Sequence, residues 1–408
     1  MIKLLTFTSF LACSSLAWSQ SATAPTTRKP TSPTALQKYQ SQKKGITLPN
    51  VTAILQWGPV SLRPHVDYEY SSVNGLNSNN EESNDTDIQK FSAGINFLLG
   101  EHWTLDYTST WTRHSNDAFE DTRDDRLNLN GWAQTANWIL NFSQSYTIDS
   151  STQIESASQS ESESFTTNIQ GTRQLGRRTG LDLSLNYNQR DAEDFSGDND
   201  YNNTAAISTM NWFRYENSQR LNTAIGAGIG YTDVEDGIDS SYQTAQVQAN
   251  FQLTQKISLS ASAGVETRQI KIEGSDTLTN PVFDAAINYD PFEQTQLRFS
   301  AGKTVNYSIF RDDIAERVSW TFDFSQRFLG RYFFDFSTSQ RESDFIDSTN
   351  GNSVAESDTY KSFSYRLSTN FLNKGKIGVF YHSSDNESTI GSFEQNSYQT
   401  GVDVSYDF

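Results

Sequence analysis

Polar and apolar residues alternate along this chain from about Pro59 to its last residue, Phe408. In the stretch LDLSLNY, residues 181–187, three leucines and a tyrosine share one face while Asp, Ser and Asn occupy the other. A period of two is typical of β-strands, because successive side chains of a strand point to opposite sides. We count about eighteen such segments of roughly 9 to 15 residues, the length that a tilted strand needs to cross a bilayer.

The connections between these segments are alternately short and long. Short connections are expected near Gly100, Ala136, Gly176, Glu216, Thr254, Pro291, Leu329 and Asn373. The longer connections are acidic, for example residues 71–87, 149–164 and 233–240. An up-and-down antiparallel barrel has this rhythm when its short turns face the periplasm and its long loops face the outside. The acidic loops either keep that surface solvated or bind divalent cations that bridge them to anionic lipopolysaccharide.

Several β architectures alternate in this way, so the choice among them depends on other features. A secreted sandwich, a propeller or a β-helix would also give period-two segments, but no fixed repeat of roughly 40 to 50 residues is visible. The polar faces suit a wet lumen, and the apolar faces begin or end in aromatic residues, as interfacial girdles do. A strand that ends at Phe408 can close a barrel by pairing with the first strand, which leaves no free edge in lipid.

We therefore expect an all-β fold, a single transmembrane up-and-down antiparallel β-barrel of about 18 strands, with 16 strands as the alternative. The barrel is expected to span residues 59–408. Parity predicts that the following side chains face lipid: Leu181, Leu183, Leu185, Trp320, Phe322 and Phe363.

The N-terminal residues resemble an export signal. Lys3 precedes an apolar run, and a small-x-small cleavage site ends at Ser19, so residues 1–19 are predicted to be a signal peptide. A lipoprotein signal ending at Cys13 is the alternative. Residues 20–58 are rich in Ser, Thr, Pro and Lys and are predicted to be a flexible periplasmic leader. Cys13 is the only cysteine, so the mature chain is expected to contain no disulfide.

Composition excludes other classes of protein. The mean hydropathy of −0.62 is too polar for a helical membrane protein, and no later stretch approaches the roughly 20 apolar residues of a spanning helix. The formal net charge of −18 argues against nucleic acid and anionic lipid headgroups as direct partners.

The chain ends in Tyr406, Asp407 and Phe408, and this ending, with the signal peptide, the alternation and the two kinds of connection, resembles Gram-negative outer-membrane β-barrel proteins. Within them the chain is most similar, for instance in LRFSAGKTVNYSIF (297–310), to the β-barrel porin type 2 group, some members of which accompany exopolysaccharide export. The resemblance implies a location in the cell outer membrane. It also implies contact with outer-membrane lipid and lipopolysaccharide, and insertion by the barrel-assembly machinery, with Tyr406 and Phe408 as the assembly signal.

Enzymatic activity is not expected. The chain has four histidines, and a Ser, His and acid set could be assembled only around His114 or within residues 382–385. Such residues are common in any polar loop. No glycine loop for phosphate or calcium is present, so no cofactor or metal is expected. Gly226, Gly228 and Gly230 are interpreted as small lumen-side residues where a strand bends.

Two functions remain after these exclusions. The first is a porin-like channel for passive diffusion of small hydrophilic solutes, because about eighteen strands enclose an aqueous channel. The second is a structural or secretion-associated barrel, for example in exopolysaccharide export, without an open pore of its own.

The inward faces of the strands supply the candidate site. The candidate pore-lining residues are Arg298, Arg317, Asp323, Arg331, Asp335, Arg341, Arg366, Asp67 and Glu69. A basic wall would attract anionic solutes. The alternative is that each arginine pairs with an acid across the strands and stabilises the wall. Lys303 falls on the apolar face, which indicates a bulge or a rim position.

Overall fold

The structure of the chain is a computed structural model. It describes residues 55–77, 83–153, 158–195, 201–235, 237–271, 277–308, 313–346, 354–372, 374–390 and 393–408. The predicted signal peptide and most of the predicted leader therefore lie outside the described residues. Within the described residues, no helix has the length and apolar character that crossing a membrane requires.

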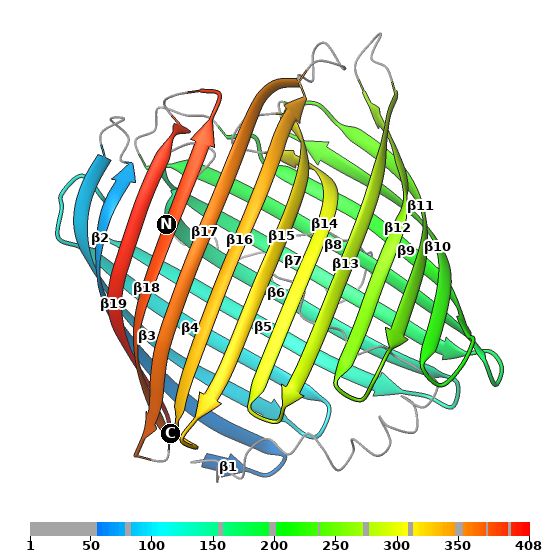
Figure 1. Ribbon diagram of the computed structural model, residues 1–408, viewed down its shortest axis with the longest axis horizontal. Coiled ribbons are helices and arrows are strands. Elements are labelled where there is room, and N and C mark those ends of the chain that lie inside the picture. The colour runs from blue at the N-terminus through cyan, green and yellow to red at the C-terminus, as the bar shows by residue number, and fades with distance from the viewer. Residues whose placement is uncertain are drawn as a thin grey trace.

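Eighteen of the described strands form the barrel (Figure 1). They are β2 (Val60–Asn77), β3 (Ser83–Leu99), β4 (Trp103–His114), β5 (Thr122–Gln134), β6 (Trp138–Gln153), β7 (Ser158–Gln174), β8 (Thr179–Asp194), β9 (Thr204–Glu216), β10 (Leu221–Val234), β11 (Ser240–Gln252), β12 (Ile257–Ile270), β13 (Thr277–Phe292), β14 (Thr295–Ser308), β15 (Asp313–Phe328), β16 (Tyr332–Ile346), β17 (Val354–Phe371), β18 (Gly375–Ser388) and β19 (Gln395–Asp407). These strands are 12 to 18 residues long, so several are longer than the alternation predicted.

Each barrel strand pairs antiparallel with the next, and the last pairs with the first. In this closing pair Val402 of β19 stands opposite Tyr70 of β2. The Phe408 amide then donates a hydrogen bond to the Pro64 carbonyl, at 3.0 Å. The predicted closed antiparallel barrel is confirmed, with eighteen strands rather than sixteen.

The short turns all lie at one end of the barrel, which we call the short-turn rim; the opposite end is the long-loop rim (Figure 1). All eight predicted short connections are found, for example Gly100–His102 between β3 and β4. Gly100 has φ 65°, a conformation that glycine adopts without a Cβ penalty.

The long acidic connections are shorter than predicted. β2 continues to Asn77 and β3 begins at Ser83, both inside the predicted loop 71–87. β6 and β7 likewise extend into the predicted loop 149–164. Above an apolar belt both faces of a strand meet water, so the apolar alternation disappears although the backbone ladder continues. This is why sequence patterning placed the strand ends too early.

A short additional strand, β1 (Leu55–Trp57), pairs with residues 60–62 of β2. It lies inside the segment predicted to be a flexible leader, so that boundary was wrong by a few residues. Gly58 has φ 59°, which allows a two-residue turn between β1 and β2.

The outer face of the barrel is apolar and exposed. Ile225 is 64% exposed and Phe363 is 40% exposed. Aromatic rings form a continuous band across β15 to β18, with centroid separations of 6.1 Å for Phe322–Phe336, 5.1 Å for Phe336–Phe363 and 5.1 Å for Tyr365–Tyr381. Apolar surface of this extent on a closed barrel is suited to lipid, where every backbone group must be paired within the wall.

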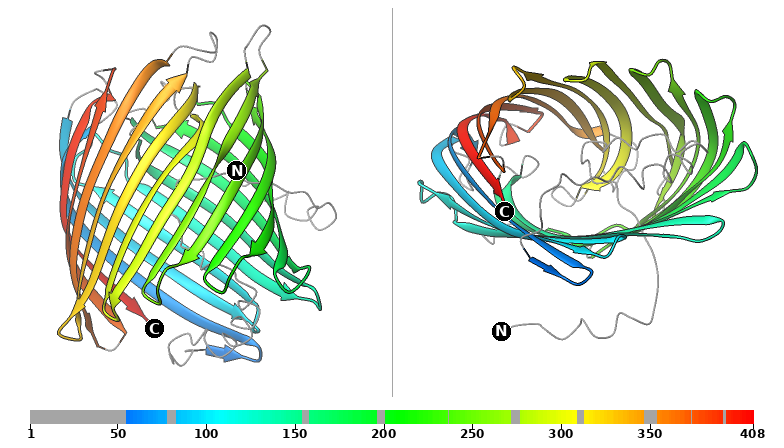
Figure 2. Two further views of the ribbon diagram at one scale, coloured as in Figure 1. Left: turned by 45° about the vertical axis from the view of Figure 1, so that its right-hand side comes forward. Right: turned by 90° about the horizontal axis from the view of Figure 1, so that it is seen from below.

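One part of the wall departs from the regular cylinder. β13 and β14 are ladder partners only up to the pair Phe283–Lys303. Beyond that pair β14 and β15 turn toward the interior of the barrel, as the yellow part of the wall in Figure 2 shows. We call residues 304–308 of β14 and 313–316 of β15 the inward segment. The register between β14 and β15 stays regular through this region, so no bulge accompanies Lys303.

The buried apolar cluster of the described residues lies at this inward turn. It comprises Ile270, Leu278, Val305, Ile314 and Ile346, with Ile238 packed against it. Val305 and Ile314 have the parity of the outer face, whereas Ile270 and Leu278 project from the inner face of β12 and β13. In the inward segment, the side chains that have outer-face parity therefore pack against the inner face of the wall.

Candidate functional site in the barrel lumen

The register places the predicted arginine of β14 on the inner wall. Arg298 stands between Asn288 of β13 and Asp323 of β15. Its Nε donates a hydrogen bond to the Asn288 Oδ1, at 3.1 Å. Asp323 accepts a hydrogen bond from the Ser337 Oγ, at 2.7 Å. Both charged groups are therefore oriented by neutral polar neighbours within the wall.

Arg366 of β17 forms an ion pair with Asp403 of β19. The bridge crosses the strand between them at Gly378 of β18, which is opposite both Ser368 and Asp403 in the ladder. A Cβ at Gly378 would lie 2.7 Å from the Asp403 Oδ1 and 2.9 Å from the Arg366 Nε. Glycine therefore provides the space that this ion pair needs.

The remaining predicted acids also have polar neighbours. Asp335 stands opposite Arg366 in the ladder and accepts a hydrogen bond from the Ser325 hydroxyl. Glu69 stands between Asp403 and Lys90 in the register. Asp67 stands opposite Ser405. Glu69 and Asp403 thus form an acidic pair in the ladder, flanked by Lys90 on one side and by the Arg366 ion pair on the other.

Arg317 and Arg341 lie nearer to the long-loop rim. Arg317 pairs in the register with Thr304, at the base of the inward segment. The Arg341 Cζ lies 5.4 Å from the centroid of the Tyr360 ring on β17. These two positions bring positive charge next to the place where the wall turns inward.

Arg331 was wrongly predicted to line the pore wall. β15 ends at Phe328 and β16 begins at Tyr332, so Arg331 belongs to the turn between them and is exposed at the short-turn rim. Its Cζ lies 4.8 Å from the centroid of the Tyr332 ring. Parity alone cannot show where a strand ends, and this turn contains Leu329 and Gly330 with φ of 50° and 72°.

Several charged lumen positions were missed from the sequence. Asp403 and Lys90 face the same lumen but were not among the predicted pore-lining residues. Arg268 and Glu266 of β12 form a buried ion pair, with 2.8 Å between the Arg268 Nη2 and the Glu266 Oε1. The sequence signal for this ion pair was a Glu and an Arg two positions apart, on the inner face of one strand.

The three glycines of β10 lie on the lumen side, as the sequence predicted. Gly226, Gly228 and Gly230 lie on the inner face, and the side chains nearest to their vacant Cβ positions include Trp212 and Tyr242. Bulky lumen residues of β9 and β11 therefore occupy the space above these glycines.

Neither Ser, His and acid set is assembled as a catalytic triad in the described residues. The His114 Nδ1 lies 3.0 Å from the Glu120 carbonyl, and the Ser115 Oγ accepts a hydrogen bond from the Asp87 amide at 2.8 Å. His382 and Ser383 are consecutive residues of β18 and point to opposite faces of the wall. The described residues also contain no group of three or more His, Cys, Asp or Glu that could hold a metal ion.

Charge is distributed unevenly between the two rims. The short turns contain six basic residues and two acidic residues: Arg177, Arg178, Arg220, Lys256, Arg331 and Lys374, against Glu101 and Glu293. At the long-loop rim, by contrast, acids such as Asp117, Glu120 and Asp121 occupy the connection between β4 and β5. The barrel is therefore polarised along its axis.

No protein-family model matches this chain, and no curated protein matches it. The chain is similar to several solved structures, among them an outer membrane protein. The outer membrane protein opdK from Pseudomonas aeruginosa is 10% identical, with a TM-score of 0.45, and the match covers 85% of this chain and 98% of that chain. Pseudomonas aeruginosa OccK2 (OpdF) in complex with glucuronate is 12% identical, with a TM-score of 0.46 and coverage of 85% and 98%. Acinetobacter baumannii OccAB3 is 9% identical, with a TM-score of 0.42 and coverage of 85% and 99%.

Proposed function

We propose that this protein is an outer-membrane channel for the passive diffusion of small hydrophilic solutes. The observation that carries the proposal is a closed barrel of eighteen described strands with a polar inner face and an exposed apolar outer face. Barrels of about 16 to 18 strands leave an aqueous passage between their inward side chains.

The outer face supports the location in this proposal. Its apolar belt and aromatic band fit the hydrocarbon layer, and the short-turn rim would face the periplasm. Tyr406 and Phe408 form an edge-to-face ring pair, with centroids 4.9 Å apart, at that rim. We propose these two rings as the signal for the barrel-assembly machinery. As part of the same proposal, the barrel contacts lipopolysaccharide and is related to the β-barrel porin type 2 group.

The proposed channel prefers anions. Arg298, Arg317 and Arg341 supply positive charge along β14 to β16, and fixed charge on a pore wall sets ion selectivity. Arg366 contributes less, because Asp403 balances its charge within the wall. For Arg366 this ion pair supports the alternative stated from the sequence, in which an arginine pairs with an acid across the strands.

A liposome-swelling assay tests the proposal. Vesicles that contain the refolded full chain are diluted into isotonic solutions of a neutral disaccharide, of a small organic anion or of an organic cation of similar size. We expect swelling with the disaccharide and with the anion, and faster swelling with the anion than with the cation. Heat-denatured protein in the same vesicles is the control. Folded barrels that give no swelling with any small solute would contradict the proposal.

A second candidate function rests on the basic short-turn rim. If the barrel is part of an exopolysaccharide export system, six basic turn residues at the periplasmic mouth would favour the capture of an anionic polymer. In that case an acidic polysaccharide should block ion current when it is added at the short-turn side and not at the long-loop side. Equal blockade from the two sides would remove the support for this function.

A further inference from the structure

We infer that Arg268 is a positioning residue that holds the inward segment inside the barrel and thereby sets the width of the pore. The inference rests on the proposed function for its consequence, but not for its geometry. The barrel wall is broken where β13 and β14 stop pairing.

The break leaves strand edges without their ladder neighbour. β13 pairs with β14 up to Phe283–Lys303, so residues 277–282 and 304–308 are not ladder partners of each other. Pro281 lies in this part of β13, and proline is tolerated in a sheet where a strand is an edge, because it has no N–H to donate. The sequence of β13 is therefore compatible with its separation from β14 at this level.

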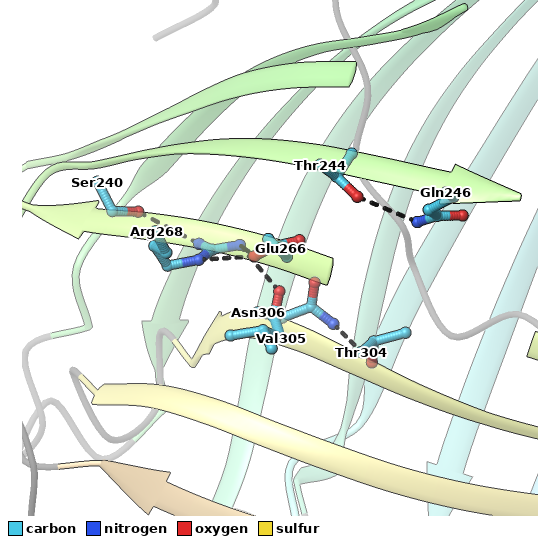
Figure 3. Close-up of polar contacts among 8 residues, drawn as sticks. All are labelled: Ser240, Thr244, Gln246, Glu266, Arg268, Thr304, Val305 and Asn306. Carbon is cyan, nitrogen blue, oxygen red and sulfur yellow. Dashed lines mark hydrogen bonds and ion pairs between the residues drawn. The ribbon is translucent and has the colours of Figure 1, made fainter. Parts of the chain in front are cut away.

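Arg268 makes a contact that the broken ladder no longer provides. Its Nη2 donates a hydrogen bond to the Val305 carbonyl of the inward segment, at 3.0 Å (Figure 3). Backbone carbonyls that leave a ladder need another donor when they are buried. A side chain from β12 thus ties down the backbone of β14, although β13 lies between these strands in the barrel order.

The guanidinium is itself held rigidly. Its Nε and Nη2 donate to the Glu266 Oε1, at 3.1 and 2.8 Å, and its Nη1 donates to the Ser240 Oγ, at 3.3 Å. Its Cζ lies 4.7 Å from the centroid of the Tyr242 ring. The residue is only 3% exposed. Because the guanidinium donates hydrogen bonds to several fixed partners, its position is set before it binds the Val305 carbonyl.

Apolar packing also holds the inward segment against the inner wall, but it is less specific for position than the hydrogen bond from Arg268. Val305 and Ile314 of the inward segment pack in one cluster with Ile270 and Leu278 of the inner wall. Such packing tolerates sliding, whereas the hydrogen bond to the Val305 carbonyl fixes the segment in one register. Lys303 and Glu316 close the base of the segment, with 2.5 Å between the Nζ and the Oε2.

The other side of the inward segment is polar and has the parity of the lumen face. It carries Thr304 and Asn306, whose Nδ2 donates to the Thr304 Oγ1 at 3.4 Å. A docked segment therefore replaces a stretch of regular wall with polar side chains closer to the pore axis. Undocking it should widen the passage at this level.

Single-channel recording of the full chain with Arg268→Met tests the inference, because methionine keeps much of the side-chain length and removes every donor. We expect a higher unit conductance and more open-channel noise than in the parent. Arg298→Met is the matched control: it removes an inner-wall arginine from a regular part of the wall. It should change ion selectivity without added noise.

A second readout keeps the inference independent of conduction. With Cys13 removed by processing or replaced by Ser, a cysteine at Val305→Cys should be protected from a water-soluble maleimide in the parent and labelled quickly with Arg268→Met. If the parent gives no ion current but this protection pattern holds, the proposed function fails and the positioning role stands. Labelling that is equal in the two backgrounds would overturn the role of Arg268.

A crosslink covers the case in which Arg268→Met does not fold. The pair Leu278→Cys and Val305→Cys, joined by oxidation or by a short bifunctional thiol reagent, should leave the conductance of the Arg268-containing protein unchanged, since the segment is already docked. A large fall in conductance on crosslinking would mean that the segment is normally undocked, which contradicts the inference. Reduction of the same sample is the control.

Discussion

The Arg366 guanidinium pairs with the Asp403 carboxylate across an intervening strand, over the bare backbone of Gly378. The three residues come from β17, β18 and β19, so the pair joins the strands beside the closing seam of the barrel. This relationship makes one charge of the basic wall a structural charge, and it shows how a glycine can decide which charged groups meet.

Gly378→Ala should weaken this ion pair. A Cβ there would lie 2.7 Å from the Asp403 Oδ1 and 2.9 Å from the Arg366 Nε. The Arg366 side chain is 38% exposed, so the pair itself is worth only about 0.2 to 1 kcal/mol. We expect a small fall in the urea midpoint for loss of the heat-modifiable gel form. Gly302→Ala is the control, because its nearest contact would be 3.2 Å. Equal midpoints for both variants would refute the steric account.

Charge selectivity should depend on Arg317 and Arg341 and not on the Arg366–Asp403 pair. Substituting Ser for both Arg317 and Arg341 removes two inner-wall charges and should move the reversal potential in a salt gradient toward cations. The shift should grow at low ionic strength, where screening is weak. The charge-neutral double variant Arg366→Ser and Asp403→Asn should keep the parent's selectivity. If the first variant also keeps it, the basic-wall proposal should be abandoned.

The assignment of the outer face can be tested at Phe322, which lies in the aromatic band. Phe322→Arg would place a charge in the hydrocarbon layer and should destabilise the barrel by about 2 to 4 kcal/mol. The neighbouring Thr321→Arg points into the lumen and should cost far less. Urea unfolding in lipid vesicles measures both, and similar losses would show that the two faces were assigned incorrectly.

Phe408 should matter for insertion more than for the finished barrel. Its amide bonds to Pro64 through the backbone and its ring contacts Tyr406 at the rim, so loss of the ring removes little packing. Phe408→Asp should slow the appearance of the heat-modifiable form in pulse-labelled cells while leaving the urea midpoint close to that of the parent. Insertion at the parent's rate would count against an assembly signal at this residue.

Alternation predicted the fold well because the period of two is a local property. Leu183, Phe363 and Val402 could each be assigned to the outer face from their immediate neighbours. The turn near Gly100 was equally local, since a positive φ there suits glycine. Strand ends were less predictable: the polar residues 71–77 continue β2 beyond the point where apolar alternation stops.

The site was harder to predict because it depends on register between strands that are distant in sequence. Arg366 and Asp403 are separated by 37 positions, and only the ladder shows that Gly378 lies between them. Lys303 was recognised as out of place on an apolar face, but the cause is the departure of β14 from β13, which no local pattern shows. The contact of Arg268 with a backbone carbonyl carries no sequence signal at Val305.

Single-channel recording of the refolded parent protein in a planar bilayer would show whether the barrel is an open diffusion channel. An open eighteen-strand barrel predicts discrete, long-lived steps of conductance with no partner present, and a reversal potential in a salt gradient that shows anion preference. Protein that is fully in its heat-modifiable form and inserts into the bilayer, yet passes no current without a partner, would contradict the account of a diffusion channel.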